Sequence, residues 1–356
     1  MDIIEIIKEG LGLGASDIIL SIESPVTFHV NGILQHSREN TPLNEESCRN
    51  LIYQFLTMEQ RKTIEMEKEL DVGYSIKGLA RFRVSVYYQK GTLAAVLRVV
   101  PLRIPPPQEI GLPMDVVIRL CSIPNGLILV TGPTGAGKST TIASIIEFVN
   151  TAGGIPRHVI TIEDPVEFVF KPQLCVIDQR EIGPDTNSYV RGLRSALRAM
   201  PHIIFVGEMR DRETIEIALR AAETGNIVIS TLATRSAATT INRVIDVFPV
   251  DHQAEIRTRL SLSLRAVVSQ VLLRRIDVPG RVAAREVMFV TNPISNLIRE
   301  GKIHQIPNVI STQARDGMVL LDDSLLTLVE NGVIDPATAL TYASDIEKMR
   351  PVLKRR

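Results

Sequence analysis

The chain has few cysteines, and their positions do not suggest a covalent or metal-bound framework. Cys48, Cys121 and Cys175 are far apart, and the chain contains no C-x-x-C pair. This spacing argues against a disulfide scaffold and against a cysteine zinc site, because both need thiols that can be brought together in pairs. The scarcity of cysteine fits a protein of the reducing cytoplasm.

The chain also lacks a net charge. Its 40 basic residues balance 40 acidic residues, which gives a formal charge of zero. Without an overall positive field, and without a stripe of interleaved basic and aromatic residues, the sequence does not predict a nucleic-acid partner. Translocation of nucleic acid is therefore a disfavoured function for this chain, and salt-dependent DNA binding would revive it.

Long apolar runs are absent as well. No stretch approaches the roughly 18 apolar residues that a membrane-spanning helix needs. The N-terminus "MDIIEIIKEG" carries Asp2 and Glu5 where a secretory signal would be basic. We therefore expect a cytoplasmic protein, with any membrane contact made through a partner.

The length and the distribution of proline predict two domains. A chain of 356 residues suggests about two domains at roughly 150 residues each. Residues 1–100 mix helical spacing with strand-like segments, which indicates a small α/β domain. Residues 101–113, "PLRIPPPQEIGLP", contain five prolines. Neither a helix interior nor a central strand accommodates them, so this segment is expected to be a stiff linker and hinge, followed by a second domain over 114–356.

The second domain shows the pattern of a mostly parallel sheet. Short apolar segments rich in Ile and Val alternate with helical segments, as in buried parallel strands. The segments interpreted as strands are "GLILVTG", "HVITIED", "HIIFVGE", "NIVISTL" and "RVAAREVMFV". From about residue 291 the apolar spacing becomes helical again, which predicts a C-terminal helical region.

A phosphate-binding motif lies between the first of these strands and the helix that follows it. "GPTGAGKSTT" satisfies G-x-x-x-x-G-K-[ST]. Glycines in such a loop let backbone N–H groups surround phosphate oxygens, the lysine reaches the terminal phosphates, and the serine hydroxyl can bind Mg²⁺. The predicted ATP-binding residues are Gly132, Pro133, Thr134, Gly135, Ala136, Gly137, Lys138, Ser139 and Thr140.

Acidic side chains follow two other predicted strands. Glu163, Asp164 and Glu167 come at and just after one strand, and Glu208 follows another. Because ligands bind at the carboxyl edge of such sheets, these acids are expected beside the phosphate loop. An apolar strand that ends in an acid usually serves the metal side of P-loop enzymes.

Several long motifs together resemble the secretion-superfamily ATPases, and within them the retraction motors of type IV pili. They are "GPTGAGKSTT", "TIEDPVEF", "QREIGPDT", "RSALR", "VGEMRDRETIEIALRAAETG" and "TTINRVIDVFP". The resemblance covers nearly the whole chain. It implies an α/β fold with a PAS-like N-terminal domain and a RecA-like ATPase domain, assembled into a homo-hexameric ring that hydrolyses ATP with Mg²⁺.

The resemblance also implies roles for individual residues. Glu167 would be the general base that activates water, and Glu208 would support Mg²⁺ together with Ser139. Glu163 and Asp164 would lie next to these two acids. The N-terminal domain would contribute three arginines to the nucleotide phosphates, and such arginine fingers raise rates by about 10³ to 10⁵. These arginines are Arg81, Arg83 and Arg98.

The C-terminal motif points to the retraction branch of the family. "NPISNLIREGK" is similar to the motif that marks retraction motors, and the chain lacks the tetracysteine site of extension motors. The resemblance therefore implies a motor that pulls pilin subunits back into the membrane through an inner-membrane platform protein, with the proline-rich linker as its hinge.

The chain departs from the family where its members carry histidines. Asn226 and Ala233 stand at the two positions of the so-called His box, and Ile19, Met200 and His202 are further departures. Neither an amide nor a methyl group can deliver a proton near neutral pH. Losing one preorganised donor costs about 10² to 10³ in rate. The alternative function is thus a weakly active or structural nucleotide-binding paralogue that assists another retraction ATPase.

Overall fold

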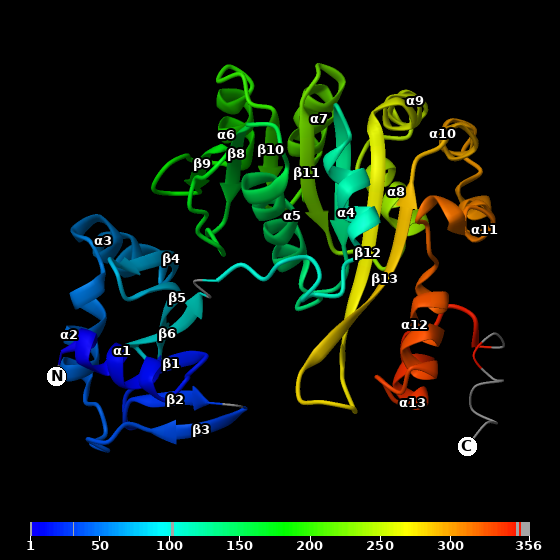
Figure 1. Ribbon diagram of the computed structural model, residues 1–356. Coiled ribbons are helices and arrows are strands. Elements are labelled where there is room, and N and C mark those ends of the chain that lie inside the picture. The colour runs from blue at the N-terminus through cyan, green and yellow to red at the C-terminus, as the bar shows by residue number, and fades with distance from the viewer. Residues whose placement is uncertain (1, 31, 101–102, 347–348, 350–356) are drawn as a thin grey trace. The chain divides into compact units, whose positions relative to one another are not determined.

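The chain folds into two compact units, each with its own sheet (Figure 1). A computed structural model describes residues 2–30, 32–100, 103–346 and 349. The first unit comprises Met1–Arg103 and Pro165–Val169, and the second comprises Ile104–Asp164 and Phe170–Arg356. Of the expected linker, residues 101 and 102 lie outside the described residues. From Ile104 onward the segment belongs to the second unit.

The first unit is built on a six-stranded sheet in the order β3-β2-β1-β6-β5-β4. All the neighbouring strand pairs are antiparallel. Its elements are α1 (Ile3–Gly12), β1 (Asp17–Leu20), β2 (Thr27–Val30), β3 (Ile33–His36), α2 (Glu45–Phe55), α3 (Met58–Glu67), β4 (Glu69–Ile76), β5 (Ala80–Gln89) and β6 (Thr92–Val100).

Alternation along the strands separates the two faces of this sheet. In β5, Ala80, Phe82 and Val84 are buried, whereas Arg81 and Arg83 between them are only partly buried. Successive side chains of a strand point to opposite faces, so the apolar residues enter the core and the arginines stand on the other face. The core is completed by apolar residues of the three helices.

The second unit contains a seven-stranded sheet in the order β13-β12-β7-β11-β10-β8-β9. All neighbours are parallel except β12 and β13, which are antiparallel. The strands are β7 (Gly126–Thr131), β8 (His158–Glu163), β9 (Val176–Glu181), β10 (Ile203–Val206), β11 (Ile227–Leu232), β12 (Leu264–Arg274) and β13 (Arg281–Phe289). A mostly parallel sheet with crossover helices confirms the predicted RecA-like architecture.

The helices of the second unit connect these strands and then extend the chain beyond them. They are α4 (Met114–Cys121), α5 (Lys138–Ala152), α6 (Tyr189–Ala196), α7 (Arg212–Glu223), α8 (Ala237–Asp246), α9 (Gln253–Ser263), α10 (Asn292–Arg299), α11 (Ile306–Thr312), α12 (Leu321–Glu330) and α13 (Pro336–Tyr342), with short 3-10 turns at Ile303–Gln305 and Ala314–Asp316. Helix α12 packs beside β13 (Figure 1). Within the described ranges, no helix combines the length and the apolarity that crossing a bilayer requires.

Two strands of this sheet were not predicted. Strand β9 lies at the sheet's edge and has two apolar residues followed by four polar or charged ones, a composition that is typical of a polar loop. Strand β12 contains Ser269 and Gln270, which interrupt its apolar run, yet both side chains are buried. Buried polar residues need hydrogen-bond partners, and here the partners come from the phosphate loop and β7, which are remote in the sequence.

Candidate functional site

The phosphate loop connects β7 to α5 through a backbone that requires glycine. Gly132 has φ +146° and Gly137 has φ +82°, both in a region that residues with a side chain avoid. A Cβ on Gly132 would also lie 2.2 Å from the carbonyl oxygen of Gln270. The loop therefore depends on glycine both for its turn and for its close approach to β12.

The loop and the helix after it are arranged to hold an anion. Helix α5 spans 15 residues, and no side chain caps its N-terminus at Gly137. The first N–H groups of a helix have no partner inside the helix, and they favour phosphate. The ammonium of Lys138 lies within the loop and donates to the carbonyl oxygens of Gly132 at 2.9 Å and Pro133 at 3.2 Å. Ser139 follows Lys138 in the first turn of the helix.

The acids of the second unit gather at the carboxyl edge of the same sheet. Strands β8 and β10 are parallel neighbours, so Glu163 at the end of β8 and Glu208 just after β10 reach the same edge. Glu163 is only 6% exposed. Its Oε1 accepts hydrogen bonds from the Thr161 hydroxyl at 2.6 Å and from the Gln179 amide at 3.2 Å. This carboxylate is therefore held in a fixed orientation.

Glu208 is paired with a basic side chain. Its Oε2 lies 2.7 Å from a guanidinium nitrogen of Arg210. The hydrogen bond to Glu208 and the charge of that carboxylate raise the pKa of Arg210 above its ordinary value. The Glu208 side chain remains 27% exposed, so it is accessible for a further contact.

Tyr189 is a member of this edge that sequence reasoning missed. Burial raises the pKa of its hydroxyl well above the ordinary value, and the nearby charge of Asp164 raises it further. The hydroxyl lies against Gly207, where an added Cβ would be 2.9 Å away. The hydroxyl of Tyr189 therefore stays protonated at neutral pH, near the carboxylates of Asp164 and Glu208. Its only sequence signal is its place directly after a helix-capping serine, Ser188, which does not indicate a site.

Glu167, the expected general base, belongs to the first unit. It lies in Pro165–Val169, the short segment of the second unit's βα loop that packs with the N-terminal residues. Within the first unit, Nε of Arg81 donates to the carbonyl oxygen of Val166 at 3.4 Å. The predicted residues therefore divide, with Glu167 and the three arginines in one unit and the phosphate loop, Glu163, Asp164 and Glu208 in the other.

The three arginines share one face of the first unit's sheet. Arg81 and Arg83 alternate along β5, and Arg98 on β6 lies directly opposite Arg83. Like charges opposite each other on neighbouring strands are destabilising. Asp17, on β1 at the other side of Arg98, offsets this repulsion because its Oδ1 accepts from Nε of Arg98 at 2.7 Å.

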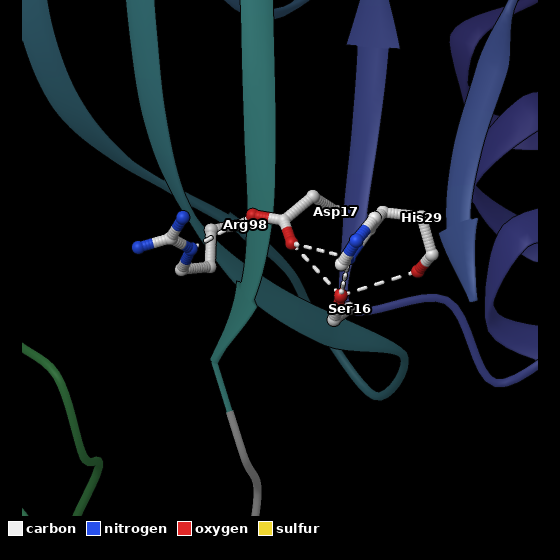
Figure 2. Close-up of polar contacts among 4 residues, drawn as sticks. All are labelled: Ser16, Asp17, His29 and Arg98. Carbon is white, nitrogen blue, oxygen red and sulfur yellow. Dashed lines mark hydrogen bonds and ion pairs between the residues drawn. The ribbon is translucent and has the colours of Figure 1, made fainter. Parts of the chain in front are cut away.

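Figure 2 shows how Asp17 connects Arg98 to two further side chains. Oδ2 of Asp17 accepts from the Ser16 hydroxyl at 2.8 Å and lies 3.6 Å from Nδ1 of His29. Ser16 is also 2.9 Å from that ring nitrogen. Asp17 is thus held by neighbours on the side away from Arg98, whose side chain is 68% exposed. The arrangement fixes one end of an arginine that otherwise extends into solvent.

The two departures from the His box lie at opposite ends of β11. Asn226 precedes the strand, and its amide donates to the carbonyl oxygen of Pro201 at 2.7 Å. Ala233 follows the strand and is exposed. Because β7 and β11 are parallel neighbours, the phosphate loop is at the same edge as Ala233, and Asn226 is at the opposite edge. Within one chain, only Ala233 shares an edge with the predicted nucleotide site.

Other polar residues near β11 form hydrogen bonds or ion pairs with neighbouring residues of the second unit. Glu223 forms a two-point ion pair with Arg259, at 2.8 and 3.0 Å. The hydroxyl of Thr231 donates to the carbonyl oxygen of Gly207 at 2.6 Å, and the hydroxyls of Thr234 and Thr240 are 2.6 Å apart. Each of these side chains therefore has a hydrogen-bond or ion-pair partner within the second unit.

The site fits a magnesium ion that arrives with a nucleotide. In the described part of the chain, no three acidic, histidine or cysteine side chains are clustered closely enough to hold a metal by themselves. Mg²⁺ usually takes one or two protein ligands together with phosphate oxygens and water. A serine hydroxyl at the start of α5 and a partly exposed carboxylate after β10 match this requirement.

Comparisons with known proteins agree with this architecture. A family model described as type II/IV secretion system protein matches residues 2–300. The type IV pilus retraction ATPase PilT of Pseudomonas aeruginosa is 45% identical over 340 residues, which cover 95% of this chain and 97% of PilT. The type IV pilus ATPase PilU of the same organism is 34% identical and covers 96% of this chain and 88% of its own.

A solved structure resembles the whole chain. The crystal structure of the pilus retraction motor PilT with bound ADP matches with a TM-score of 0.91 at 42% identity, and the alignment covers 99% of both chains. The likeness therefore includes both units and the loop that holds the nucleotide phosphates in this class of enzyme.

Proposed function

The chain belongs to the type II/IV secretion system protein family and is a P-loop ATPase of the PilT kind, and from this premise we propose that it is a motor for type IV pilus retraction. The observation that best supports the proposal is the division of the candidate residues between two units. Turnover that requires groups from both units is coupled to their relative movement, as a motor requires.

We propose the following roles for the side chains. The loop N–H groups and Lys138 bind the β- and γ-phosphates of ATP, and Ser139 and Glu208 hold Mg²⁺. Bound Mg²⁺ supplies charge neutralisation at the phosphates. Glu167 accepts the proton of the attacking water, and Glu163 and Asp164 lie in the polar surroundings of that water. The arginine row of Arg81, Arg83 and Arg98 stabilises the negative charge of the transferring phosphoryl group.

The assembly we propose is a homo-hexameric ring on the cytoplasmic side of the inner membrane. ATP binding and hydrolysis would rotate the first unit of one subunit against the second unit of its neighbour. The ring would transmit this motion to an inner-membrane platform protein and draw pilin subunits out of the fibre, as in twitching motility. The relative named as a pilus retraction ATPase supports this direction of movement.

Steady-state ATP hydrolysis by the purified protein tests the catalytic part of this proposal. Replacing a general base typically costs 10²- to 10⁴-fold, so we expect Glu167→Gln to lower kcat by about that factor while KM for ATP changes little. Glu59→Gln, an exposed carboxylate on α3, is the matched control and should leave kcat unchanged. Equal turnover by the parent and Glu167→Gln would exclude Glu167 as the base.

A second candidate function is an accessory subunit that binds nucleotide and assists another retraction ATPase. The exposed methyl group of Ala233 at the carboxyl edge favours it, since an alanine side chain supplies no imidazole at this position. The similarity to PilU is compatible with it. Parent turnover at the level of Glu167→Gln, rescued by Ala233→His, would support the accessory role. Native mass spectrometry, alone and with a competent retraction ATPase, would show which ring the chain joins.

A further inference from the structure

Gln270 connects the phosphate loop to the neighbouring strand β13. It lies on β12 and is only 2% exposed. Both its backbone carbonyl and its side-chain amide lie next to the loop. Its carbonyl oxygen is the atom that would clash with a Cβ on Gly132, and its amide nitrogen would be 3.3 Å from a Cβ on Gly137. The loop is therefore packed directly on this one residue.

The side-chain amide of Gln270 uses both of its ends. Its Nε2 donates to the carbonyl oxygen of Ala136, inside the loop, at 2.5 Å. Its Oε1 accepts from the hydroxyl of Thr141, in the first turns of α5, at 2.9 Å. An amide group is planar and rigid, so a movement of the Ala136 carbonyl turns the oxygen end as well.

Arg285 continues this contact away from the loop. It lies directly opposite Gln270 on β13, and its Nε is 3.4 Å from Oε1 of Gln270. Its two terminal nitrogens donate to the carbonyl oxygens of Ile110 and Gly111, each at 2.8 Å. Those two residues lie in the proline-rich segment that leads from the first unit into the second.

The environment of Arg285 makes these contacts sensitive to small movements. The side chain is 5% exposed, and the partners given above are uncharged oxygens. Burial lowers the pKa of Arg285 to about 10, so the group remains charged at neutral pH. A buried charge is tolerated only while its hydrogen bonds are satisfied, so rotation of the Gln270 amide must be matched by a shift of the guanidinium or of its carbonyl partners.

We propose that Gln270 and Arg285 form a relay that transmits phosphate binding from the loop at Ala136 to the linker at Ile110 and Gly111. Gln270 is the sensor, because it touches the loop, and Arg285 is the positioning residue that holds the linker. Coupling of this kind is carried by contiguous hydrogen-bonded groups, and typical coupling energies change an affinity or a rate by about 5- to 150-fold. The relay depends on nucleotide binding and not on the direction of pilus movement.

Hydrogen–deuterium exchange on the intact protein tests the relay. The amides of Glu109, Gly111 and Leu112 form turn hydrogen bonds within the linker, so their exchange reports on its order. We expect saturating ADP with Mg²⁺ to slow exchange in the peptide covering 104–113 at least about fivefold in the parent. In Arg285→Met that response should be lost while the ADP dissociation constant stays within about threefold. In Gln270→Leu both the response and the affinity should fall.

Arg265→Met is the matched control. Arg265 is on the same strand, and it also donates to backbone carbonyls, those of Asn125 and Leu262. Substitution of Arg265 should leave the linker's response to ADP intact. If Arg285→Met, Gln270→Leu and Arg265→Met all weakened that response, the cause would be a general loosening of the sheet, which would contradict the relay. In steady-state hydrolysis, Arg285→Met should lower kcat at least about fivefold with KM for ATP unchanged. A parent without a linker response, or Arg285→Met with the parent's response, overturns the relay.

Discussion

At the scale of single residues, the two missing histidines are not equivalent. At the amino end of β11, the Asn226 amide donates a hydrogen bond to the carbonyl oxygen of Pro201. Ala233, at the carboxyl end, is an exposed methyl group. We expect Ala233→His to change kcat for ATP, by up to about 10²- to 10³-fold if the imidazole supplies a donor to the reacting groups. Asn226→His should leave kcat within about twofold, because it is remote from the loop of its own chain.

Steady-state kinetics on the two single variants and the double variant will check this. The double variant should behave as Ala233→His does, since distant and independent sites add without coupling. A change in kcat with Asn226→His alone would contradict the assignment, and it would indicate that the amino end of β11 reaches the nucleotide of another subunit.

Residues with local signals were predictable, and residues with distant partners were not. The glycines, Lys138 and Ser139 form a contiguous motif, so nine consecutive residues indicated the phosphate loop. Gln270 and Arg285 have no such motif, because their partners lie 134 and 174 residues away along the chain. Tyr189 was missed for the same reason.

At the scale of elements, helix α7 depends on the residue that caps its N-terminus. Asp211 is the N-cap, and its two oxygens accept from the backbone N–H of Thr214 at 2.8 Å and from the hydroxyl of the same residue at 2.7 Å. Burial acts to raise the pKa of Asp211, but these hydrogen bonds prevail and lower it below the ordinary 3.8. The folded state therefore favours the carboxylate.

We expect Asp211→Ala to reduce the free energy of unfolding of the second unit by about 1 kcal/mol at pH 7. A carboxyl whose folded pKa is depressed stabilises the fold above its unfolded pKa, and that stabilisation is lost as pH falls through the folded value. Urea unfolding at pH 7 and pH 3 should thus show a smaller difference between parent and variant at pH 3. Asp246→Ala, an exposed acid on α8, should change stability by less than about 0.5 kcal/mol. An undiminished Asp211→Ala difference at pH 3 would contradict the linkage.

Elements with clear periodicity were predicted well, and elements with mixed composition were not. Apolar strands such as β7 and β10 are buried throughout, and their composition indicated this. Strand β12 was not recognised because its polar residues Ser269 and Gln270 are buried through hydrogen bonds to β7 and to the phosphate loop. Strand β9 was not recognised because it lies at the sheet's edge and is mostly polar. The linker's prolines indicated stiffness, but its contact with Arg285 was not predictable, because this arginine is 174 residues from Gly111 along the chain.

At the scale of the whole molecule, the cysteines distinguish the two units. Cys48 lies in the core of the first, whereas Cys121 and Cys175 lie in the second. Burial raises the pKa of Cys48 and of Cys121 to about 11, with Arg157 opposing the shift at Cys121. Because only the thiolate reacts, native Cys48 and Cys121 should be alkylated at pH 8 at least about 10²-fold more slowly than in the unfolded chain.

Alkylation in increasing urea, read out by peptide mass spectrometry, should therefore report the unfolding of each unit separately. We expect Cys48 to become reactive at a different urea concentration from Cys121 and Cys175, because the two units have separate cores. Coincident labelling of the three thiols at every concentration would instead indicate that the units unfold as one cooperative body.

The assignment of Pro165–Val169 to the first unit also matters for how such a protein can be recombined. The chain passes between the units three times, at residues 103/104, 164/165 and 169/170. Neither unit is therefore encoded by one uninterrupted stretch of the gene. A chimera that exchanges only residues 1–103 between two relatives would join each N-terminal unit to a foreign five-residue strip that carries the acid Glu167. A successful exchange has to move both segments together.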